Sequence, residues 1–442
     1  MAGTFDQGFS FDTLAKATDL QKRLLFTVLA LFIYRIGTYI PLPGLNPAAI
    51  ADLANRHLGS GGILGMFNTF SGGALSRMTI FALNLMPYIS ASIIIQLFTM
   101  VSPQLEALKK EGETGRKVIN QYTKYLAIAV ASFQAYGLSL YLMNAQGSPV
   151  VIGGLFPVIS IPCLVCGTMF LVWLGEQITA RGVGNGSSLL IFAGIVANMP
   201  ANIENVFQLG KAGAISVFAM VMIFVFAFAM ILGVVFVERA QRKVMINYPQ
   251  RQAILARGQN MDMSYLPLKI NSAGVIPPIF AYSLISLPMM VAGFLASGGD
   301  NEWLNDIINI FGRGGITFSI IFVALIMFFS FFYTAVVFNP TETSDNLKKA
   351  GGYIPGVRPG KSTAEYLDYI LTRLTTVGAI YMSVVCILPD VIQNKFGAHF
   401  LFTGTGILII IGVTIDTISQ IYAQLLSHQY RGVLKKMEKK KK

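Results

Sequence analysis

The sequence predicts an all-α polytopic membrane protein with ten transmembrane helices, in two pseudo-symmetric inverted halves of five, and a re-entrant half-helix. Three observations predict this class. Hydrophobic residues make up 54% of the 442 residues and charged residues only 12%, whereas a soluble domain carries about 25% charged residues. Ten apolar runs are long enough to cross about 30 Å of hydrocarbon. A further apolar piece, residues 63–70, is too short to cross.

The ten runs follow one another along the whole chain, and each is expected to be one helix. They are residues 24–40, 78–100, 125–142, 158–174, 189–206, 215–237, 275–295, 316–338, 370–388 and 400–425. Residues 1–23 contain three aspartates and no apolar run. This segment is therefore expected to be a polar cytoplasmic lead-in rather than a cleavable signal.

Basic residues determine the orientation, because Lys and Arg accumulate on the cytoplasmic side of a membrane protein. With the N-terminus placed inside, 27 of the 33 Lys and Arg residues fall on inner segments. Both termini are therefore expected in the cytoplasm. The first five-helix half covers residues 24–206, and the second covers 207–426 with cytoplasmic loops 238–269 and 339–368. The basic tail, 427–442, is explained by topology and by attraction to anionic membrane lipids.

The chain lacks the motifs of enzymes. Its three histidines are scattered, and it contains no zinc-protease, nucleophile-elbow or nucleotide-binding motif. We therefore expect no catalytic residue, no metal and no cofactor. Cys163 and Cys166 lie one helical turn apart in an apolar span, where packing is the better explanation because no cation is nearby to stabilise a thiolate.

The residues disfavour two functional classes of helical membrane proteins. A secondary transporter for a small solute also fits inverted repeats and broken helices, but it would need ionisable residues deep in the spans. Only Arg35 and Asp416 approach that description, and Arg35 is expected to pair locally or reach outward. An intramembrane hydrolase is disfavoured because the sequence offers no nucleophile or metal set.

The second and seventh spans are unusual in the same way. Pro87 interrupts one, and Pro277 and Pro278 interrupt the other. Proline removes a backbone donor and kinks a helix, and broken helices at matching places in two halves indicate a functional interface. The second span also carries a series of polar residues. They could hydrogen-bond between packed helices or line a water-filled interior, and they are Asn84, Ser90, Ser92 and Gln96.

The short piece before the second span is joined to it by Ser71, Gly72 and Gly73, which we expect to act as a flexible link. Irregular backbone at membrane depth is tolerated only where it is buried in protein or lines a water-filled cavity. The piece is therefore expected to fold back into a central cavity, where it would act as a removable stopper.

Six segments closely resemble the bacterial SecY family, the channel subunits of the protein translocon. They read FSGGALSR (70–77), MPYISASIIIQ (86–96), KEGE (110–113), WLGEQIT (173–179), FNPTETSDNLKK (338–349) and YIPGVRPG (353–360). The resemblance covers nearly the whole chain. It implies a channel in the bacterial cytoplasmic (inner) membrane that translocates unfolded preproteins and releases hydrophobic segments laterally into the bilayer.

The resemblance also implies an apolar constriction, which closes a narrow neck by dewetting without binding the sliding chain strongly. Its ring carries over to Leu85, Ile89, Ser187, Ile191, Ile279 and Ile409. Ser187 departs from the family pattern, which expects an aliphatic residue there.

The family's plug corresponds to residues 63–74, with the candidate residues Ile63, Leu64, Met66, Phe67, Asn68, Phe70, Ser71, Gly72 and Gly73. Its lateral gate opens between the second and seventh spans. The candidate gate residues are Pro87, Ser90, Ser92, Gln96, Asn271, Ile276 and Pro277.

The two long cytoplasmic loops are expected to project as basic docking fingers. By resemblance they bind the ribosome and the SecA motor ATPase through Arg239, Arg242, Lys243, Arg251, Arg257 and Arg358. Basic tips suit the phosphate backbone of ribosomal RNA. The resemblance further implies SecE and SecG subunits, preprotein signal sequences and membrane lipids as partners.

Overall fold

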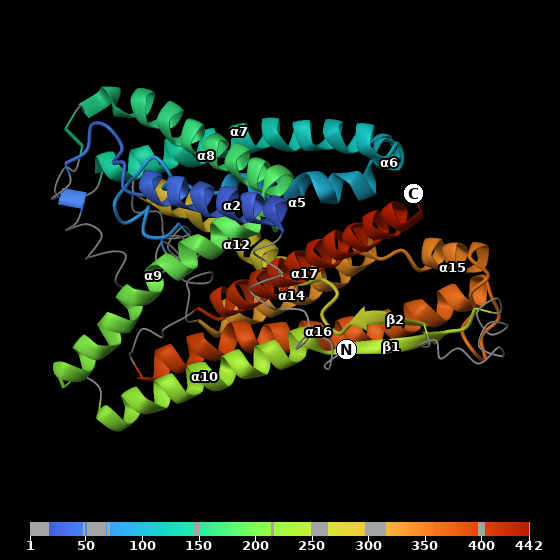
Figure 1. Cartoon of the computed structure of the whole chain (residues 1–442). Helices are drawn as coiled ribbons and strands as arrows, with labels where there is room; N and C mark the ends of the chain where they lie inside the picture. The colour runs from blue at the N-terminus through green and yellow to red at the C-terminus, as the bar shows by residue number, and fades with distance from the viewer. Residues whose placement is uncertain are drawn as a thin grey trace. The chain divides into compact units, whose positions relative to one another are not determined.

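The computed structural model describes residues 17–46, 49–50, 68, 71–144, 150–151, 153–213, 216–248, 264–296, 315–396 and 403–441. Within these ranges the chain forms long helices and one two-stranded sheet (Figure 1). The chain divides into two compact units. The first unit comprises Met1–Asn205, Ser286–Arg313 and Ile409–Lys442, and the second comprises Val206–Ile285 and Gly314–Leu408.

Each of the ten predicted spans overlaps one helix. These helices are α2 (Thr18–Gly37), α5 (Met86–Val101), α7 (Glu113–Asn144), α8 (Phe156–Arg181), α9 (Gly186–Lys211), α10 (Val217–Arg239), α12 (Ile276–Ala296), α14 (Ile316–Val337), α16 (Lys361–Phe396) and α17 (Gly404–Lys441). Among the described residues, seven stretches are long and apolar enough to cross a membrane, and they lie in α7, α8, α9, α10, α14, α16 and α17. The predicted polytopic helical class is confirmed.

Small residues let the helices of the first unit pack closely. α7 packs against both α5 and α8 (Figure 1). Ala127, Ala131 and Ala135 follow one another at four-residue intervals on α7 and are fully buried. Ser139 of α7 and Ser160 of α8 share a buried hydrogen bond of 2.6 Å. Small side chains and such hydroxyl bonds hold helices together where lipid offers no hydrophobic driving force.

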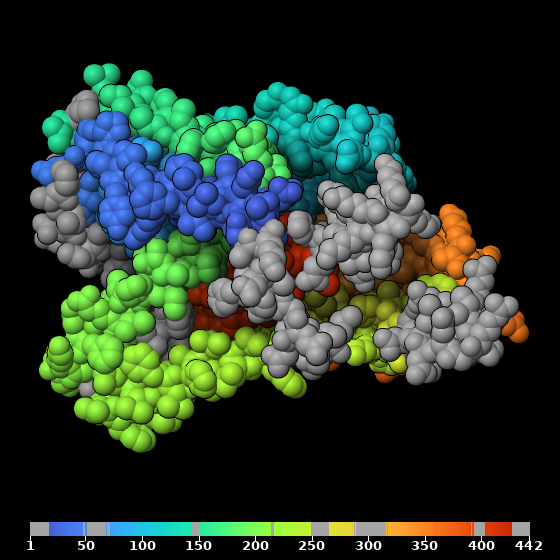
Figure 2. All heavy atoms as spheres, viewed as in Figure 1, coloured from blue at the N-terminus to red at the C-terminus, as the bar shows by residue number. Residues whose placement is uncertain are grey.

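The outward face of α2 is apolar, and α2 lies at the surface of the first unit (blue in Figure 2). Leu25, Val28 and Phe32 are 68%, 64% and 65% exposed. Exposed side chains of this size would be unfavourable in water. This face is therefore suited to lipid, although α2 is not one of the seven stretches that are long and apolar enough to cross a membrane.

The second helical span begins later than predicted, at Met86 instead of residue 78. Residues 71–85 form consecutive turns, and Met78 and Asn84 adopt positive φ of 46° and 49°. The backbone of Met78 and Ile80 instead bonds to the segment after α2: the Leu42 N–H donates to Met78 O at 2.9 Å, and the Ile80 N–H donates to Ile40 O at 3.2 Å. Apolar composition alone could not reveal these long-range bonds, which replace helical ones.

α5 ends in a sharp bend. The next helix, α6 (Pro103–Lys110), turns 99° away from α5. Ser102, between the two, has extended backbone with ψ 116°, and proline at position 103 suits the first turn of the new helix. The chain then reverses into α7, where Gly115 packs so tightly that a Cβ would lie 1.7 Å from Leu108 O.

The second unit adds a small sheet that the sequence analysis did not predict. β1 (Gln241–Ile246) pairs antiparallel with β2 (Ser264–Lys269), in a register that runs from Gln241↔Lys269 to Ile246↔Ser264. Val244 and Ile246 are buried while the residues between and before them are exposed. This two-residue alternation is typical of a half-buried strand. A short helix, α15 (Pro340–Lys349), follows α14, and the Asn339 side chain caps its first turn.

Candidate functional site

The link before α5 is buried and hydrogen-bonded, so within the described residues it is an anchored turn and not a flexible hinge. Gly72 and Gly73 adopt positive φ of 67° and 83°, which glycine reaches at no steric cost. The Gly73 N–H donates to Asn68 O at 2.9 Å, and Asn198 Nδ2 of α9 donates to the same oxygen at 3.2 Å. The link and the one described residue of the preceding piece are thus tied to α9.

Arg35 holds the same link from the other side. Its Nη1 donates to Gly72 O at 2.9 Å, and its Nη2 donates to the Tyr39 hydroxyl at 3.0 Å. Arg77 also lies over the Tyr39 ring, 4.2 Å from its centroid, and donates to Thr38 O at 3.3 Å. The expectation that Arg35 pairs locally is confirmed.

Of the predicted plug residues, the structure describes Asn68, Ser71, Gly72 and Gly73. Ile63, Leu64, Met66, Phe67 and Phe70 lie outside the described residues. Asn68 organises the turns between itself and α5: its Oδ1 accepts from the Ser76 N–H at 2.9 Å, and its carbonyl accepts from Ser71 Oγ at 3.1 Å. The plug assignment stays a prediction.

Five of the six predicted constriction residues belong to the first unit. Leu85, Ile191 and Ile409 are buried, and Ile89 and Ser187 are half-buried. Ile279 belongs to the second unit and is half-buried. The ring therefore stays a prediction.

The predicted gate residues lie on α5 and at the start of α12. On α5, Pro87 and Ser90 are buried, and Gln96 Nε2 donates to Ser92 Oγ at 3.1 Å. Before α12, Asn271 Nδ2 donates to Glu238 Oε1 at 2.7 Å and to Gly274 O at 3.0 Å. Ile276 and Pro277 are the first two residues of α12, and Pro87 is in the first turn of α5. The prediction that these prolines interrupt the two helices is therefore wrong, because they begin them. Because Gln96 and Ser92 both belong to α5, the hydrogen bond between these two members of the polar series lies within that helix.

The two predicted cytoplasmic loops fold together through a small apolar core. We call this structure the loop module; it consists of residues 240–248, 264–270 and 338–371. Its backbone is joined by a pair of hydrogen bonds, in which Asn247 N–H donates to Tyr353 O at 2.8 Å and Tyr353 N–H donates to Asn247 O at 2.9 Å. The buried core residues are Val244, Leu268, Ile354, Leu367, Ile370 and Leu371.

The tip of the loop module is a turn held by side-chain bonds to its backbone. Ser344 Oγ donates to Gly360 O at 2.7 Å, and Thr363 Oγ1 donates to Arg358 O at 2.9 Å. Arg358 is exposed on this turn, and Arg242 and Lys243 are exposed on β1. Arg239, at the end of α10, is exposed as well, while Arg251 and Arg257 lie outside the described residues.

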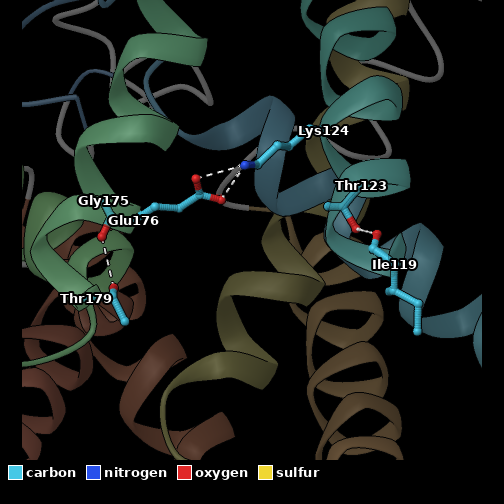
Figure 3. A network of polar contacts seen from close by, with 6 residues as sticks. All are labelled: Ile119, Thr123, Lys124, Gly175, Glu176 and Thr179. Atoms are coloured by element: carbon cyan, nitrogen blue, oxygen red, sulfur yellow. Dashed lines mark hydrogen bonds and ion pairs between the residues drawn. The ribbon is translucent and has the colours of Figure 1, made fainter. Parts of the chain in front are cut away.

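An ion pair that the sequence analysis missed joins α7 to α8 (Figure 3). Lys124 Nζ lies 2.7 Å from Glu176 Oε1 and 2.8 Å from Oε2. The predicted third span begins at residue 125 and the fourth ends at 174. Opposite charges directly beside the start of one span and the end of the next were the signal that could have revealed this pair.

Within the described residues, no group of three or more His, Cys, Asp or Glu residues is gathered as metal ligands would be. Cys163 and Cys166 instead line an apolar hollow between α2 and α8, together with Ile36 and Phe170. Cys163 is half-buried and Cys166 is exposed, so their role as packing residues stays a prediction.

The fold is that of a protein translocation channel. The chain matches a solved structure whose description states that the plug domain of the SecY protein stabilises the closed state of the translocation channel and maintains a membrane seal. The TM-score is 0.65 at 17% identity, over 92% of this chain and 93% of that one. Sec61 in the canine ribosome–channel complex from the endoplasmic reticulum matches with a TM-score of 0.64 at 16% identity, over 92% and 93% of the two chains.

Sequence comparison gives the family. The SecY family profile matches residues 79–418. The protein translocase subunit SecY of Rickettsia conorii is 46% identical over 426 residues, which cover 96% of this chain and 97% of that protein. The chain therefore belongs to the SecY family. It is a multi-pass membrane protein and the protein-conducting channel subunit of a translocase, not an enzyme, and the solute-transporter alternative no longer applies.

Proposed function

We propose that unfolded preproteins cross the bacterial cytoplasmic membrane through a neck formed by Leu85, Ile89, Ser187, Ile191, Ile279 and Ile409. The observation that carries this proposal is the non-helical stretch Ser71–Leu85 between two apolar helices. Its link residues are buried, and Gly72 bonds to Arg35. Such backbone is tolerated at membrane depth only where protein encloses it or water reaches it, as around a stoppered channel.

Residues 63–74 act as the plug of this channel. The anchored link supports the assignment, because bonds from α2 and α9 to Gly72 and Asn68 would return the stopper to one closed position. The plug of the solved SecY structure is described as maintaining a membrane seal. The same role fits the glycine-linked piece of this chain.

Apolar signal sequences and membrane spans leave sideways between α5 and α12. Prolines at the start of both helices support this role, because a proline in the first turn costs no helical hydrogen bond. Each gate helix can then begin abruptly beside irregular backbone. The gate side chains are Pro87, Ser90, Ser92, Gln96, Asn271, Ile276 and Pro277.

The loop module docks the ribosome and the SecA motor. Exposed Arg242, Lys243 and Arg358 on a packed core provide the fixed positive charge that a phosphate backbone recognises. Arg239, Arg251 and Arg257 add to this charge. The canine Sec61 structure is of a ribosome–channel complex, and SecE and SecG complete the translocase here, with both termini of this chain in the cytoplasm.

Site-specific crosslinking tests the conducting route. Photoreactive residues at Ile89 and Ile279 should each crosslink to a preprotein stalled in the membrane, measured as a shifted band on a gel. Val225, which is 56% exposed on α10, is the control and should crosslink to lipid only. Crosslinks to the stalled chain from Val225 alone would contradict the proposed neck.

A further inference from the structure

We propose that the Lys124–Glu176 ion pair positions the first turn of α9 and so keeps the constriction closed at Ser187 and Ile191. The inference rests on the proposed function, because it takes these two residues as part of the neck. Lys124 and Glu176 belong to neither the plug nor the neck in the proposal, and they act through the helices that carry them.

The pair connects two different helices at their inner ends. Its side chains are 35% and 42% exposed, and both carboxylate oxygens lie within 2.8 Å of the ammonium. Figure 3 shows the two side chains reaching toward each other from α7 and α8. A different ion pair, Lys110–Glu106, is 74% and 53% exposed and lies within the single helix α6. Unlike that pair, Lys124–Glu176 can fix one helix against another.

Glu176 follows directly after the point where α8 touches α9 backbone to backbone. A Cβ on Gly186 would lie 1.9 Å from Gly175 O, so no side chain separates the two helices there. One turn further on, Thr179 Oγ1 accepts from the Gly186 N–H at 2.9 Å and donates to Gly175 O at 2.9 Å. A packed protein interior has low compressibility, so a displacement of α8 is transmitted to α9 and is not absorbed between them. The position of α8 therefore sets the position of Gly186.

Ser187 comes next in the chain and depends on the same contact. A Cβ on Gly175 would lie 3.3 Å from both Ser187 N and Ser187 Oγ, so the serine lies directly beside α8. Ile191 lies one turn later on α9 and is buried. A loosened α8 would let both residues move, and the serine, with its hydroxyl, is the weakest member of an apolar neck.

Charge-neutral variants of the complete translocase test the inference. Lys124→Gln and Glu176→Gln should each raise the resting ion conductance of proteoliposomes by up to about five-fold, since removing an ion pair of partial exposure shifts a closed–open equilibrium by about that factor. Lys124→Arg and the swap Lys124→Glu/Glu176→Lys should restore the wild-type value. Lys110→Gln is the matched control, because it removes the same contact chemistry within one helix and should change nothing.

Hydrogen exchange measures the positioning itself and does not depend on transport. The Gly186 to Leu190 amides should exchange faster in Lys124→Gln and Glu176→Gln, while those of α14 and α16 keep their rates. An unchanged exchange rate at Gly186 in the Gln variants would overturn the positioning role. A raised ion conductance in Lys124→Arg, equal to that of Lys124→Gln, would overturn it as well. If the Gly186 amide exchanges faster in the two Gln variants but no variant conducts ions, the coupling between α8 and α9 is retained. That result would count against the proposed neck instead.

Discussion

At the scale of single residues, Arg35 shows how a charge can be needed inside a membrane protein without moving ions. Its guanidinium lies beside the buried Gly72 carbonyl and the Tyr39 hydroxyl, and Gly72 itself approaches α9 closely, with a Cβ position 3.2 Å from Gly194 Cα. An intramembrane charge usually indicates function. Here the charge satisfies backbone that a helix would otherwise have satisfied.

Replacing Arg35 should loosen the link. Arg35→Leu leaves the buried Gly72 carbonyl without its donor, which costs about 1–3 kcal/mol. We expect a lower unfolding temperature in detergent and a raised resting ion leak in proteoliposomes. Lys22→Leu, an exposed position of the same helix, is the control. An equal leak in both variants would show that loss of charge on α2, and not the bond to Gly72, is responsible.

Two helical glycines give opposite predictions for the same substitution. Gly186→Ala puts a Cβ 1.9 Å from Gly175 O and should destabilise the protein by about 1–3 kcal/mol through overpacking. Gly233→Ala on α10 meets no atom within 4 Å and should be neutral or stabilising by up to about 1 kcal/mol, because alanine favours helix. Thermal unfolding of both variants measures the difference, and equal midpoints would contradict the backbone contact between α8 and α9.

At the scale of elements, the loop module shows that two segments about a hundred residues apart share one core. Val244 and Leu268 come from the hairpin, while Ile354 and Leu367 come from the later loop and α16. Loop backbone that is fixed by such a core loses little conformational freedom on binding a partner. The module therefore carries its charge on a rigid support.

A core substitution should loosen both loops together. Leu367 is fully buried, so Leu367→Ala should cost about 2–5 kcal/mol of local stability. Hydrogen exchange should then increase both at Gln241–Ile246 and at residues 353–358. Val377→Ala, at a position 57% exposed on the same helix, should leave both segments unchanged. Faster exchange in one loop alone would contradict a shared core.

The sequence predicted the helices better than the connections between them. Each of the ten apolar runs overlaps a helix of the described residues, because a span must satisfy its backbone internally and so reveals itself by length. The late start of α5 could not be predicted, because it depends on bonds from Leu42 and to Ile40, about 40 residues earlier. The hairpin was missed because six-residue strands in a charged loop give a weak periodic signal, here only Val244 and Ile246.

At the scale of the whole molecule, the chain divides into two compact units that are each built from several separate stretches of sequence, and the two five-helix halves stay a prediction. α9, α12 and α17 each contribute residues to both units. Helices that run across the division connect the units covalently at several points. The charge distribution is a separate whole-chain property, since 27 of the 33 basic residues fall on segments expected to face inward.

Topology reporters test that charge distribution directly. A fluorescent protein fused after Lys442 should fluoresce, because it folds in the cytoplasm, whereas alkaline phosphatase fused after Gly213 in the predicted outer loop should be active, because it needs the oxidising side. The positive-inside rule places the basic hairpin and the tail on one face, so exchanging the two reporters should abolish both signals. Phosphatase activity at Lys442 together with fluorescence at Gly213 would show that the chain has the opposite orientation in the membrane. The loop module would then face away from ribosomes and from SecA.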